Sequence, residues 1–447
     1  MSTYSAPVDN VYDLPLLTPE TVLMQRDIRQ ELFKRYSEQD IVLDFLIHSG
    51  RKKMTKAPEY YHFEKGYIVG EGEVESVSGS NADGAAATIT LEESSHYESG
   101  KKTFFTVGQV VRIGTSGYQG LITAKDTTTD NAHTITVEPF DNVNIVGNIA
   151  QGDHIGVIGS AYADGTGQPE GFTQLPIEKK NQVQIFKDQF KAHGQASAWQ
   201  TEVLFGGRPF MMHDGVEDTY MRHKLLLETS VLWGQLGTRL DAQGNEVKTT
   251  RGVEEYIDTE GLAAETYTAG TWDFSNFKSV EKKLDNEQAP NEIMWLMGNE
   301  IMLDSLDVLF SKNIDTAVQY VSNSGEGSTK IADFNFQGFK YGSRKHIFKK
   351  MKVFNYKPIS GFDGSRWPGT FFVIPLHKIR NEKPSEGNNY VDSICLRYMN
   401  NGQKDRLHES WVRGRKITNL DQDEFNYASE LGLQMAGMNS SLKGYAV

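Results

Sequence analysis

The stretch RHKLLLETSVLWGQLGTRLDAQGNEVKTTRGVEEYIDTEG, from Arg222 to Gly261, decides the fold expected for this 447-residue chain. Its first third continues a helical pattern that begins at Asp214, which can cap a helix and is followed three residues later by Glu217. We predict a helix over residues 214–236 because apolar residues recur at helical spacing in two adjacent stripes. The stripes are Val216, Tyr220, Leu227, Val231 and Met221, Leu225, Leu232, Leu236. Two stripes imply that a wide face of this helix is covered.

Two further helices are expected near the amino terminus. The tripeptide TPE at 18–20 favours a helix start, and the helix would present one apolar face. A second helical run over 41–46 ends before Gly50, which can adopt the left-handed conformation that closes a helix. The basic cluster at 51–56 is expected to be the exposed end of that helix. The apolar face of the first helix consists of Met24, Ile28, Leu32 and Tyr36.

The carboxyl-terminal half mixes helices with strands, so we predict an α+β fold with a large antiparallel share. An extended segment over residues 183–204 precedes the long helix. The further expected helices span 277–287 and 299–312, and the expected strands span 293–297, 330–341, 352–356, 369–374 and 392–398.

Glycine is concentrated in residues 66–171, a segment that contains 17 of the 42 glycines. Short alternating runs bounded by Gly, Asn and Asp predict strands joined by tight turns, so we predict a separate all-β module here. Residues 70–175 contain 14 Asp and Glu against 4 Lys and Arg, a net charge of −10, whereas residues 340–416 carry +11. The strands expected in the module lie at 88–91, 107–113, 134–138 and 155–158.

The formal net charge of −13 argues against general binding to a nucleic-acid duplex or to anionic lipid. The apolar runs are too short to cross a bilayer, and the first ten residues, MSTYSAPVDN, lack the pattern of a secretory signal. A single cysteine, Cys395, rules out an internal disulfide and a cysteine-rich zinc site. Stability must therefore come from burial, hydrogen bonding or neighbouring subunits.

The histidines and glycines match no metal-binding or phosphate-binding motif. The 11 histidines are at least ten residues apart, so no helical turn presents two imidazoles to one ion. His408-Glu409 begins like a zincin helix, but Val412 stands where the second histidine belongs. The glycines at 114, 117 and 120 are interpreted as a turn in the β module.

The remaining candidate motifs also have structural interpretations. The acids at 419–430 come near a calcium loop, but Glu424 stands where a glycine must make the sharp turn. We interpret these acids as the N-terminus of a helix, where they complement the dipole. Cys395 lies in an alternating run and is interpreted as a packed strand thiol. We therefore predict no catalytic residue, no cofactor and no metal ligand.

The segment 222–261 resembles the part of tailed-phage major capsid proteins in which a long helix ends in a glutamate-rich, LWG-like turn before a Thr-Arg-Gly motif. The matching pieces here are Glu228, Leu232-Trp233-Gly234 and Thr250-Arg251-Gly252. The runs VGQVV at 107–111 and QGDHI at 151–155 resemble a β insertion found in some of these proteins, particularly those of crAss-like podophages. The resemblance covers the chain after about Tyr60.

The resemblance implies the Hong Kong ninety-seven phage-type capsid fold, with an N-arm, an E-loop, a spine helix, a peripheral domain and an axial domain. On this sequence the N-arm would span 1–56, and the E-loop strands 57–71 and 172–206 would enclose an inserted β domain at 72–171. Residues 207–447 would form the peripheral domain, with the spine helix at 214–236, and the axial domain. An insertion between two adjacent strands leaves the host fold undisturbed.

The resemblance also implies a structural, non-enzymatic subunit that assembles into pentamers and hexamers of an icosahedral head around double-stranded DNA. Its partners would be neighbouring capsid subunits, the portal, scaffolding and auxiliary head proteins, and the packaged DNA without sequence specificity. It would be found in the virion, after assembly in the host bacterial cytoplasm. From the charge counts alone, we infer that the acidic module and the basic region can meet across a subunit boundary.

Two other classes of function stay open. One is a phage tail or adhesion protein whose glycine-rich β module binds a host glycan, which predicts a monomer or a trimer. The other is an enzyme whose site is assembled from distant residues and leaves no local motif. The cargo-enclosing encapsulin shares the capsid fold, but an inserted E-loop module fits a virus better.

Overall fold

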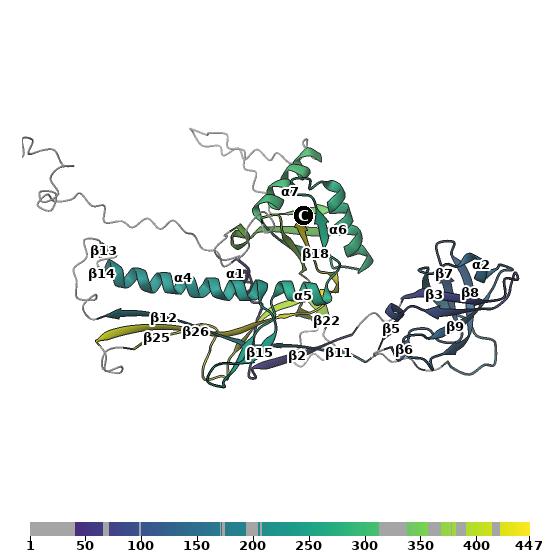
Figure 1. Ribbon diagram of the computed structural model, residues 1–447, viewed down its shortest axis with the longest axis horizontal. Helices are drawn as coiled ribbons and strands as arrows, with labels where there is room; N and C mark the ends of the chain where they lie inside the picture. The colour runs from purple at the N-terminus through teal and green to yellow at the C-terminus, as the bar shows by residue number, and fades with distance from the viewer. Residues whose placement is uncertain are drawn as a thin grey trace, which may run out of the picture. The chain divides into compact units, whose positions relative to one another are not determined.

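The computed structural model describes residues 41–65, 71–97, 100–169, 171, 175–193, 204–205, 208–312, 338–341, 343–355, 368–376, 378–380, 390–413 and 421–447. These residues form an α+β structure in which strands predominate. The chain divides into two compact units, and each is described by itself (Figure 1). Residues 62–179 form the barrel unit, and the residues before and after them form the core unit.

The core unit is built around α4 (Phe210–Trp233), which lies along strands β12 and β26 (Figure 1). Leu227, Val231 and Leu232 of this helix are buried in the main core of the unit. The helix begins directly after Pro209, where a missing N–H costs nothing because the first turn has no partner for it.

Helix α1 (Ile41–His48) packs beside α4 and adds Val42, Leu43 and Leu46 to the same core. Its carboxyl end has the hydrogen bonds of a Schellman motif: Arg51 N donates to Leu46 O (3.0 Å) and Gly50 N to Ile47 O (3.2 Å). The φ of Gly50 is +72°, as predicted for the residue that closes this helix.

The sheet beneath α4 has the strand order β1-β24-β26-β12, and β25 also pairs with β26. β26 is antiparallel to β12, β24 and β25, whereas β1 is parallel to β24. Alternate residues of β26 face α4, because strand side chains point to opposite faces in turn. The strands are β1 (Lys52–Thr55), β12 (Gln184–His193), β24 (Ile394–Met399), β25 (Glu409–Arg413) and β26 (Gln422–Met435).

A second sheet has the order β17-β27-β21-β18-β20-β19 and is covered by helices α6 and α7 on one face (Figure 1). Its other face joins the core beneath α4, so β18 is apolar along almost its whole length. Asp273 begins α6 with a capping box, in which its carboxylate accepts from Asn276 N. The elements are β17 (Glu265–Tyr267), α6 (Phe274–Asn286), β18 (Glu292–Met297), α7 (Asn299–Lys312), β19 (Gly338–Tyr341), β20 (Arg344–Lys350), β21 (Phe371–Pro375) and β27 (Leu442–Ala446).

Short elements connect these layers. Helix α5 follows a hairpin of β15 and β16, and β11 pairs with β2. The bounds are β2 (Glu59–Glu64), β11 (Ile177–Gln182), β13 (Leu204–Phe205), β14 (Arg208–Pro209), β15 (Gly237–Leu240), β16 (Glu246–Thr249), α5 (Val253–Glu260), η2 (Lys352–Asn355), β22 (Lys378–Arg380), β23 (Tyr390–Asp392) and η3 (Met438–Ser440).

The barrel unit is a closed barrel with the strand order β10-β3-β4-β9-β8-β7. Its separate core is made of every second residue of the strands, which faces inward. In β4, for example, Ala87, Ile89 and Leu91 are buried and the two threonines between them are partly exposed. The ring of Phe105 fills the space beside Gly72, where a Cβ would lie 2.5 Å from it. The elements are β3 (Glu71–Gly79), β4 (Ala87–Leu91), η1 (Glu93–Ser95), β5 (His96–Tyr97), β6 (Lys102–Thr103), β7 (Gln109–Ile113), β8 (Tyr118–Asp126), β9 (Thr134–Pro139), α2 (Ile145–Asn148) and β10 (His154–Ser160).

Several predicted elements are confirmed. The four strands expected in the glycine-rich module correspond to β4, β7, β9 and β10, and the helix predicted at 299–312 has those bounds in the structure. The extended segment from residue 183 is confirmed as far as His193. The helix predicted after residues 18–20, residues 194–203 and residues 330–337 lie outside the described residues.

Three predictions of local structure were wrong. The long helix starts at Phe210 and ends at Trp233, so Asp214 lies inside it and is not its cap. Lys52–Thr55 forms strand β1 and not a helix end, although its lysines are exposed as expected. Residues 352–355 form the 3-10 helix η2, because Val353 and Phe354 are both buried and cannot alternate as in a strand.

The largest error concerns the carboxyl-terminal acids. The residues interpreted as a helix N-terminus belong to β26 (Gln422–Met435), the long strand beneath α4. Its Glu, Ala, Leu, Gln and Met residues favour helices locally. Pairing with β12 on one side and with β24 and β25 on the other overrides that preference.

Candidate functional site

The carboxyl end of α4 meets the start of α5 at a close approach of two backbones. Gly252 N donates to Gly234 O (2.7 Å). A Cβ on Gly252 would lie 2.6 Å from Gly234 N and 2.9 Å from Val231 O, and one on Gly234 would lie 2.5 Å from Thr250 O. Both glycines are therefore required by packing, and they belong to the two sequence motifs of the region, LWG and TRG.

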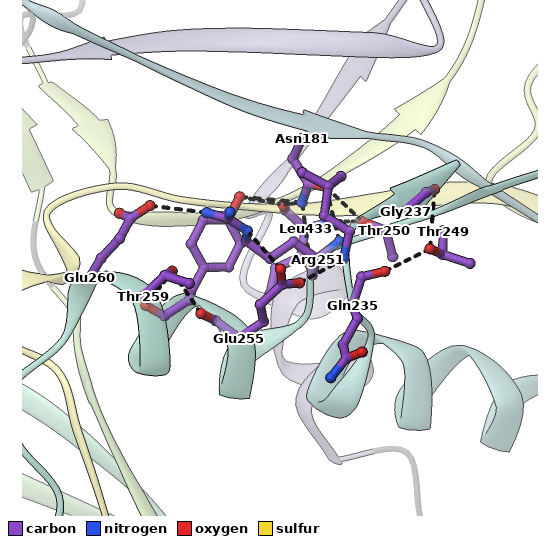
Figure 2. Close-up of polar contacts among 12 residues, drawn as sticks. Asn181, Gln235, Gly237, Thr249, Thr250, Arg251, Glu255, Thr259, Glu260 and Leu433 are labelled. Atoms are coloured by element: carbon purple, nitrogen blue, oxygen red, sulfur yellow. Dashed lines mark hydrogen bonds and ion pairs between the residues drawn. The ribbon is translucent and has the colours of Figure 1, made fainter. Parts of the chain in front are cut away.

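Asn181, at the end of β11, connects this close approach to the sheet (Figure 2). Its Oδ1 accepts from Arg251 N (2.9 Å), and its Nδ2 donates to Leu433 O (2.6 Å) and Tyr256 Oη (3.2 Å). The residue is 1 % exposed. One buried amide therefore holds β11, α5 and β26 together, using both its donor and its acceptor.

The carbonyl of Leu433 gathers three donors at this point. Besides Asn181, the hydroxyls of Tyr60 (2.9 Å) and Tyr256 (3.2 Å) donate to it. Burial raises the pKa of both tyrosines, so both stay protonated and remain donors. A Cβ on Gly432 would lie 2.6 Å from Tyr60 Oη, so this strand position also requires glycine.

The neighbouring Gln182 fixes the β15–β16 hairpin. Its Nε2 donates to the carbonyls of Gly237 (2.5 Å) and Thr249 (2.9 Å). Thr249 Oγ1 donates to Gln235 O (2.6 Å), which ties the hairpin to the turn after α4 (Figure 2). Successive residues of β11 thus anchor two different elements.

Arg251, the central residue of the TRG motif, forms the charged side of the junction. Its Nη1 lies 3.0 Å from Glu260 Oε1, its Nε lies 3.7 Å from Glu255 Oε1, and its guanidinium lies over the ring of Tyr256 (5.0 Å). The other oxygen of Glu255 accepts from Leu236 N (2.6 Å). We call the set of Asn181, Gln182, Gly234, Thr249, Thr250, Arg251, Gly252, Glu255, Tyr256, Glu260 and Leu433 the α4 junction.

Glu59 on β2 links this region to two lysines. Its carboxylate lies 3.0 Å from Lys180 Nζ and 3.1 Å from Lys248 Nζ. The hydrogen bond from Lys180, with those from Tyr61 and Lys248, lowers the pKa of Glu59 to about 2. Glu59 therefore stays charged at any ordinary pH and pairs β2 with lysines of β11 and β16 at a partly exposed position.

Five residues before the end of α4, Glu228 anchors a different segment. Its carboxylate oxygens accept from Val42 N (2.9 Å) and Leu43 N (2.8 Å), in the first turn of α1, and the side chain is fully buried. The carboxyl-terminal part of α4 therefore contacts two segments. One is α1, which follows residues 1–40, and the other is β11, which leads from the barrel unit back into the core unit.

A buried histidine lies between α4 and the sheet. His223 Nε2 is 2.9 Å from Ser429 Oγ, and its ring lies 5.9 Å from that of His408. Desolvation by burial and the nearby His408 lower the pKa of His223, and Asp188 opposes them. His223 is thus neutral at pH 7, and acidification places unfavourable charge beneath α4.

The histidine, glycine and cysteine residues of the candidate motifs lie in strands or turns of the fold. His408 and Glu409 stand at the start of β25, so the zincin-like dipeptide is not on a helix. Gly114 (φ +64°) and Gly117 (φ +71°) form the turn between β7 and β8, as predicted, whereas Gly120, predicted to belong to the same turn, lies within β8. Cys395 is buried in β24, and this burial raises the pKa of its thiol, which confirms a packed strand cysteine.

In the part of the chain that the structure describes, no group of three or more His, Cys, Asp or Glu side chains is placed to hold a metal ion. Within the same residues, no helix is both long enough and apolar enough to span a bilayer. The α4 junction is instead a network of buried polar contacts. Its Thr-Arg-Gly residues were singled out in the sequence, whereas Asn181 was not, because no local pattern marks a residue whose partners lie 70 and 252 positions away.

No protein-family model and no curated protein matches the sequence. Among solved structures, the chain is similar to one from Mycobacterium phage Adephagia (7 % identity, 99 % of this chain and 98 % of that one, TM-score 0.40). It is also similar to the Cyanophage Pam1 capsid asymmetric unit (10 %, 65 % and 82 %, TM-score 0.37). A third is the SrpI encapsulin of Synechococcus elongatus PCC 7942 (10 %, 61 % and 76 %, TM-score 0.33). These identities and TM-scores do not assign the chain to a family.

Proposed function

We propose that this chain is the major capsid protein of a tailed bacteriophage, a structural subunit that assembles into the hexamers and pentamers of an icosahedral shell around double-stranded DNA. The observation that carries the proposal is the α4 junction. Glu228, the LWG turn and the Thr-Arg-Gly motif carry the sequence resemblance to such proteins. The first two lie in the last turns of α4 or directly after it, and the third contacts the end of α4 after the β15–β16 hairpin.

The arrangement suits a shell subunit. One helix end fixes both α1, which follows residues 1–40, and β11, which follows the barrel unit. A subunit of a closed shell contacts several neighbours at once, which requires a core that fixes the points where its other segments begin. In this proposal residues 1–56 are the N-arm, and the β2 and β11 strands belong to an E-loop with the barrel inserted between them.

The partners proposed are neighbouring copies of the chain, the portal, scaffolding and auxiliary head proteins, and the packaged duplex without sequence specificity. No catalytic step is assigned to the chain. Its place would be the virion, after assembly in the host cell.

Electron microscopy of the purified full-length protein tests the proposal. Shells, or rings of five and six subunits, are expected at high protein concentration. Discrete monomers or trimers at every concentration and salt condition would refute it and favour the adhesion protein with a glycan-binding β module.

A deletion tests the inserted-domain part of the proposal. All six tryptophans lie outside residues 62–179, so tryptophan emission reports on the core unit alone. A chain in which residues 72–170 are replaced by a short turn should keep the emission maximum of the intact protein. A shift to the emission of exposed tryptophan would show that the core unit needs the barrel to fold.

A further inference from the structure

One outer wall of the barrel unit carries apolar side chains on neighbouring strands. Val110 on β7 is paired with Leu121 on β8 on one side and with Gly159 on β10 on the other. Ile158 lies next to Gly159, in the bulge of β10. Phe140 directly follows β9, the next strand around the barrel. Ile158 is 52 % exposed and Phe140 57 %. We define the barrel patch as Val110, Leu121, Phe140, Ile158 and Tyr162.

Tyr162 is held in place although it is exposed. Its hydroxyl donates to Val107 O (3.3 Å), and its ring lies against Gly108, where a Cβ would come within 2.1 Å of it. The side chain nevertheless remains 45 % exposed. A fixed tyrosine loses little conformational freedom when a partner covers it, so it favours binding more than a mobile one does.

The rim of the barrel patch is mainly acidic, although Arg112, two residues after Val110 on the same face of β7, is also exposed. Glu138 is paired with Leu121, and Asp141 and Asp164 follow Phe140 and Tyr162 closely in sequence. All three acids are exposed. A surface of this kind repels a second acidic barrel and attracts an apolar surface with basic neighbours.

The core unit presents such a surface at the edge formed by β19 and β20. Lys340 and Lys345 are directly opposite each other in the antiparallel register, and both are exposed. Like charges at opposed positions destabilise a strand pair unless an anion lies nearby. The 3.4 Å ion pair of Lys345 with Glu292 joins two exposed side chains and compensates little. Tyr341, the next residue of this edge strand, points to the opposite face of the sheet, where its ring lies against that of Phe274 (5.7 Å) and it is 39 % exposed.

We propose that the barrel patch of one copy of the chain binds the Lys340–Tyr341–Lys345 edge of a second copy. This inference deepens the proposed shell function and rests on it, because it names the surfaces through which two subunits meet. Apolar contact would supply affinity, and the acidic rim facing the lysines would select the partner surface and accelerate the encounter.

The first experiment measures, by sedimentation velocity, the concentration at which the full-length protein assembles. The Ile158→Ser/Tyr162→Ser double variant removes apolar area from the outer wall without changing charge, and Ser76→Ala on the exposed side of β3 is its control. We expect the double variant to raise the assembly concentration roughly tenfold or more, as for loss of interface hot spots, and the control to leave it unchanged.

A charge exchange tests the choice of partner surface. Lys340→Glu should weaken assembly, and combining it with Glu138→Lys in every copy should restore at least part of it. The same assembly should weaken between low and molar salt, since exposed charges are screened over about 10 Å at 0.1 M.

Cross-linking separates failure of this inference from failure of the proposed function. Chains with Ile158→Cys are mixed with chains carrying Tyr341→Cys and treated with a short bis-maleimide, while the native Cys395 is buried. Inter-chain products without shells would support the contact and refute the capsid. Shells without inter-chain products would overturn the contact and support the capsid function. Shells whose assembly concentration is the same in the double Ser variant as in the wild type would do the same. Glycan binding that is lost in the double Ser variant would also overturn it.

Discussion

The carboxylate of Glu228, fully buried on α4, accepts a hydrogen bond from the backbone N–H of Val42 at 2.9 Å. Its second oxygen accepts from the next amide, Leu43 N, at 2.8 Å. The first amides of a helix have no partner within the helix, and a carboxylate there also complements the helix dipole. An acid of the long helix thus fixes the position of α1, and this relationship joins residues 186 positions apart.

Glu228→Ala should therefore destabilise the core unit by about 2–4 kcal/mol, because two buried amides lose their acceptor and a cavity is left. Urea unfolding followed by tryptophan emission measures this loss without a contribution from the barrel. Glu228→Gln is the matched control, since it keeps one carbonyl oxygen and most of the volume and should cost about half as much. A Glu228→Gln variant as stable as the wild type would show that packing, and not the pair of hydrogen bonds, holds α1.

Asn181→Asp should introduce a pH dependence of stability at the α4 junction. The substitution turns a donor toward the carbonyl of Leu433 into a second carboxylate oxygen, so the buried Asp should have a raised pKa. A raised pKa gives stability that is present below the unfolded value of about 3.9 and lost as pH rises through the folded value.

The measurement is the urea midpoint of Asn181→Asp and of wild type at pH 5 and pH 8. The deficit of the variant should be larger at pH 8, by about 1–2 kcal/mol. Asn181→Ala serves as the control, because its deficit should be the same at both values. A pH-independent deficit in Asn181→Asp would mean that water reaches this amide.

Gly252→Ala should cost about 2–3 kcal/mol or more, since the added Cβ meets backbone atoms that cannot move aside as a side chain can. Gly156→Ala is a matched control, because a Cβ there meets nothing within 4 Å and its φ is not in the left-handed range. Thermal unfolding followed by circular dichroism compares the two. A loss below 1 kcal/mol for Gly252→Ala would contradict the close approach of the two backbones.

Local patterns predicted the parts of this fold that local interactions determine. Period-two alternation located the barrel strands, and helical periodicity located α7, because in each case one face is buried by its own unit. The same reasoning was wrong for β26, whose strand partners β12 and β24 are distant in sequence. It also missed Asn181, since a single amide that joins three elements has no periodic signature. The Thr-Arg-Gly motif could be recognised in the sequence. The close contacts of Gly252 with the backbone of Gly234 and Val231 could not, because they depend on how the chain turns after α4.

The position of His223 predicts a loss of stability on acidification. Desolvation and His408 lower the pKa of His223, and desolvation and Lys224 lower that of His408. A depressed histidine pKa gives stability that is complete above the unfolded value of about 6.5 and lost as pH falls toward the folded value. The loss is at most about 1.4 kcal/mol per pH unit for each histidine.

His223→Gln should weaken this dependence, because glutamine can retain a polar contact to Ser429 without taking up a proton. We expect the tryptophan-monitored urea midpoint to fall between pH 7.5 and pH 5.5 in the wild type and to fall less in the variant. Carboxylates elsewhere contribute equally to both proteins and cancel in the comparison. If the two midpoints fall in parallel, the histidine beneath α4 is not the group that senses pH, and the contact between this helix and its sheet does not depend on the charge of that residue.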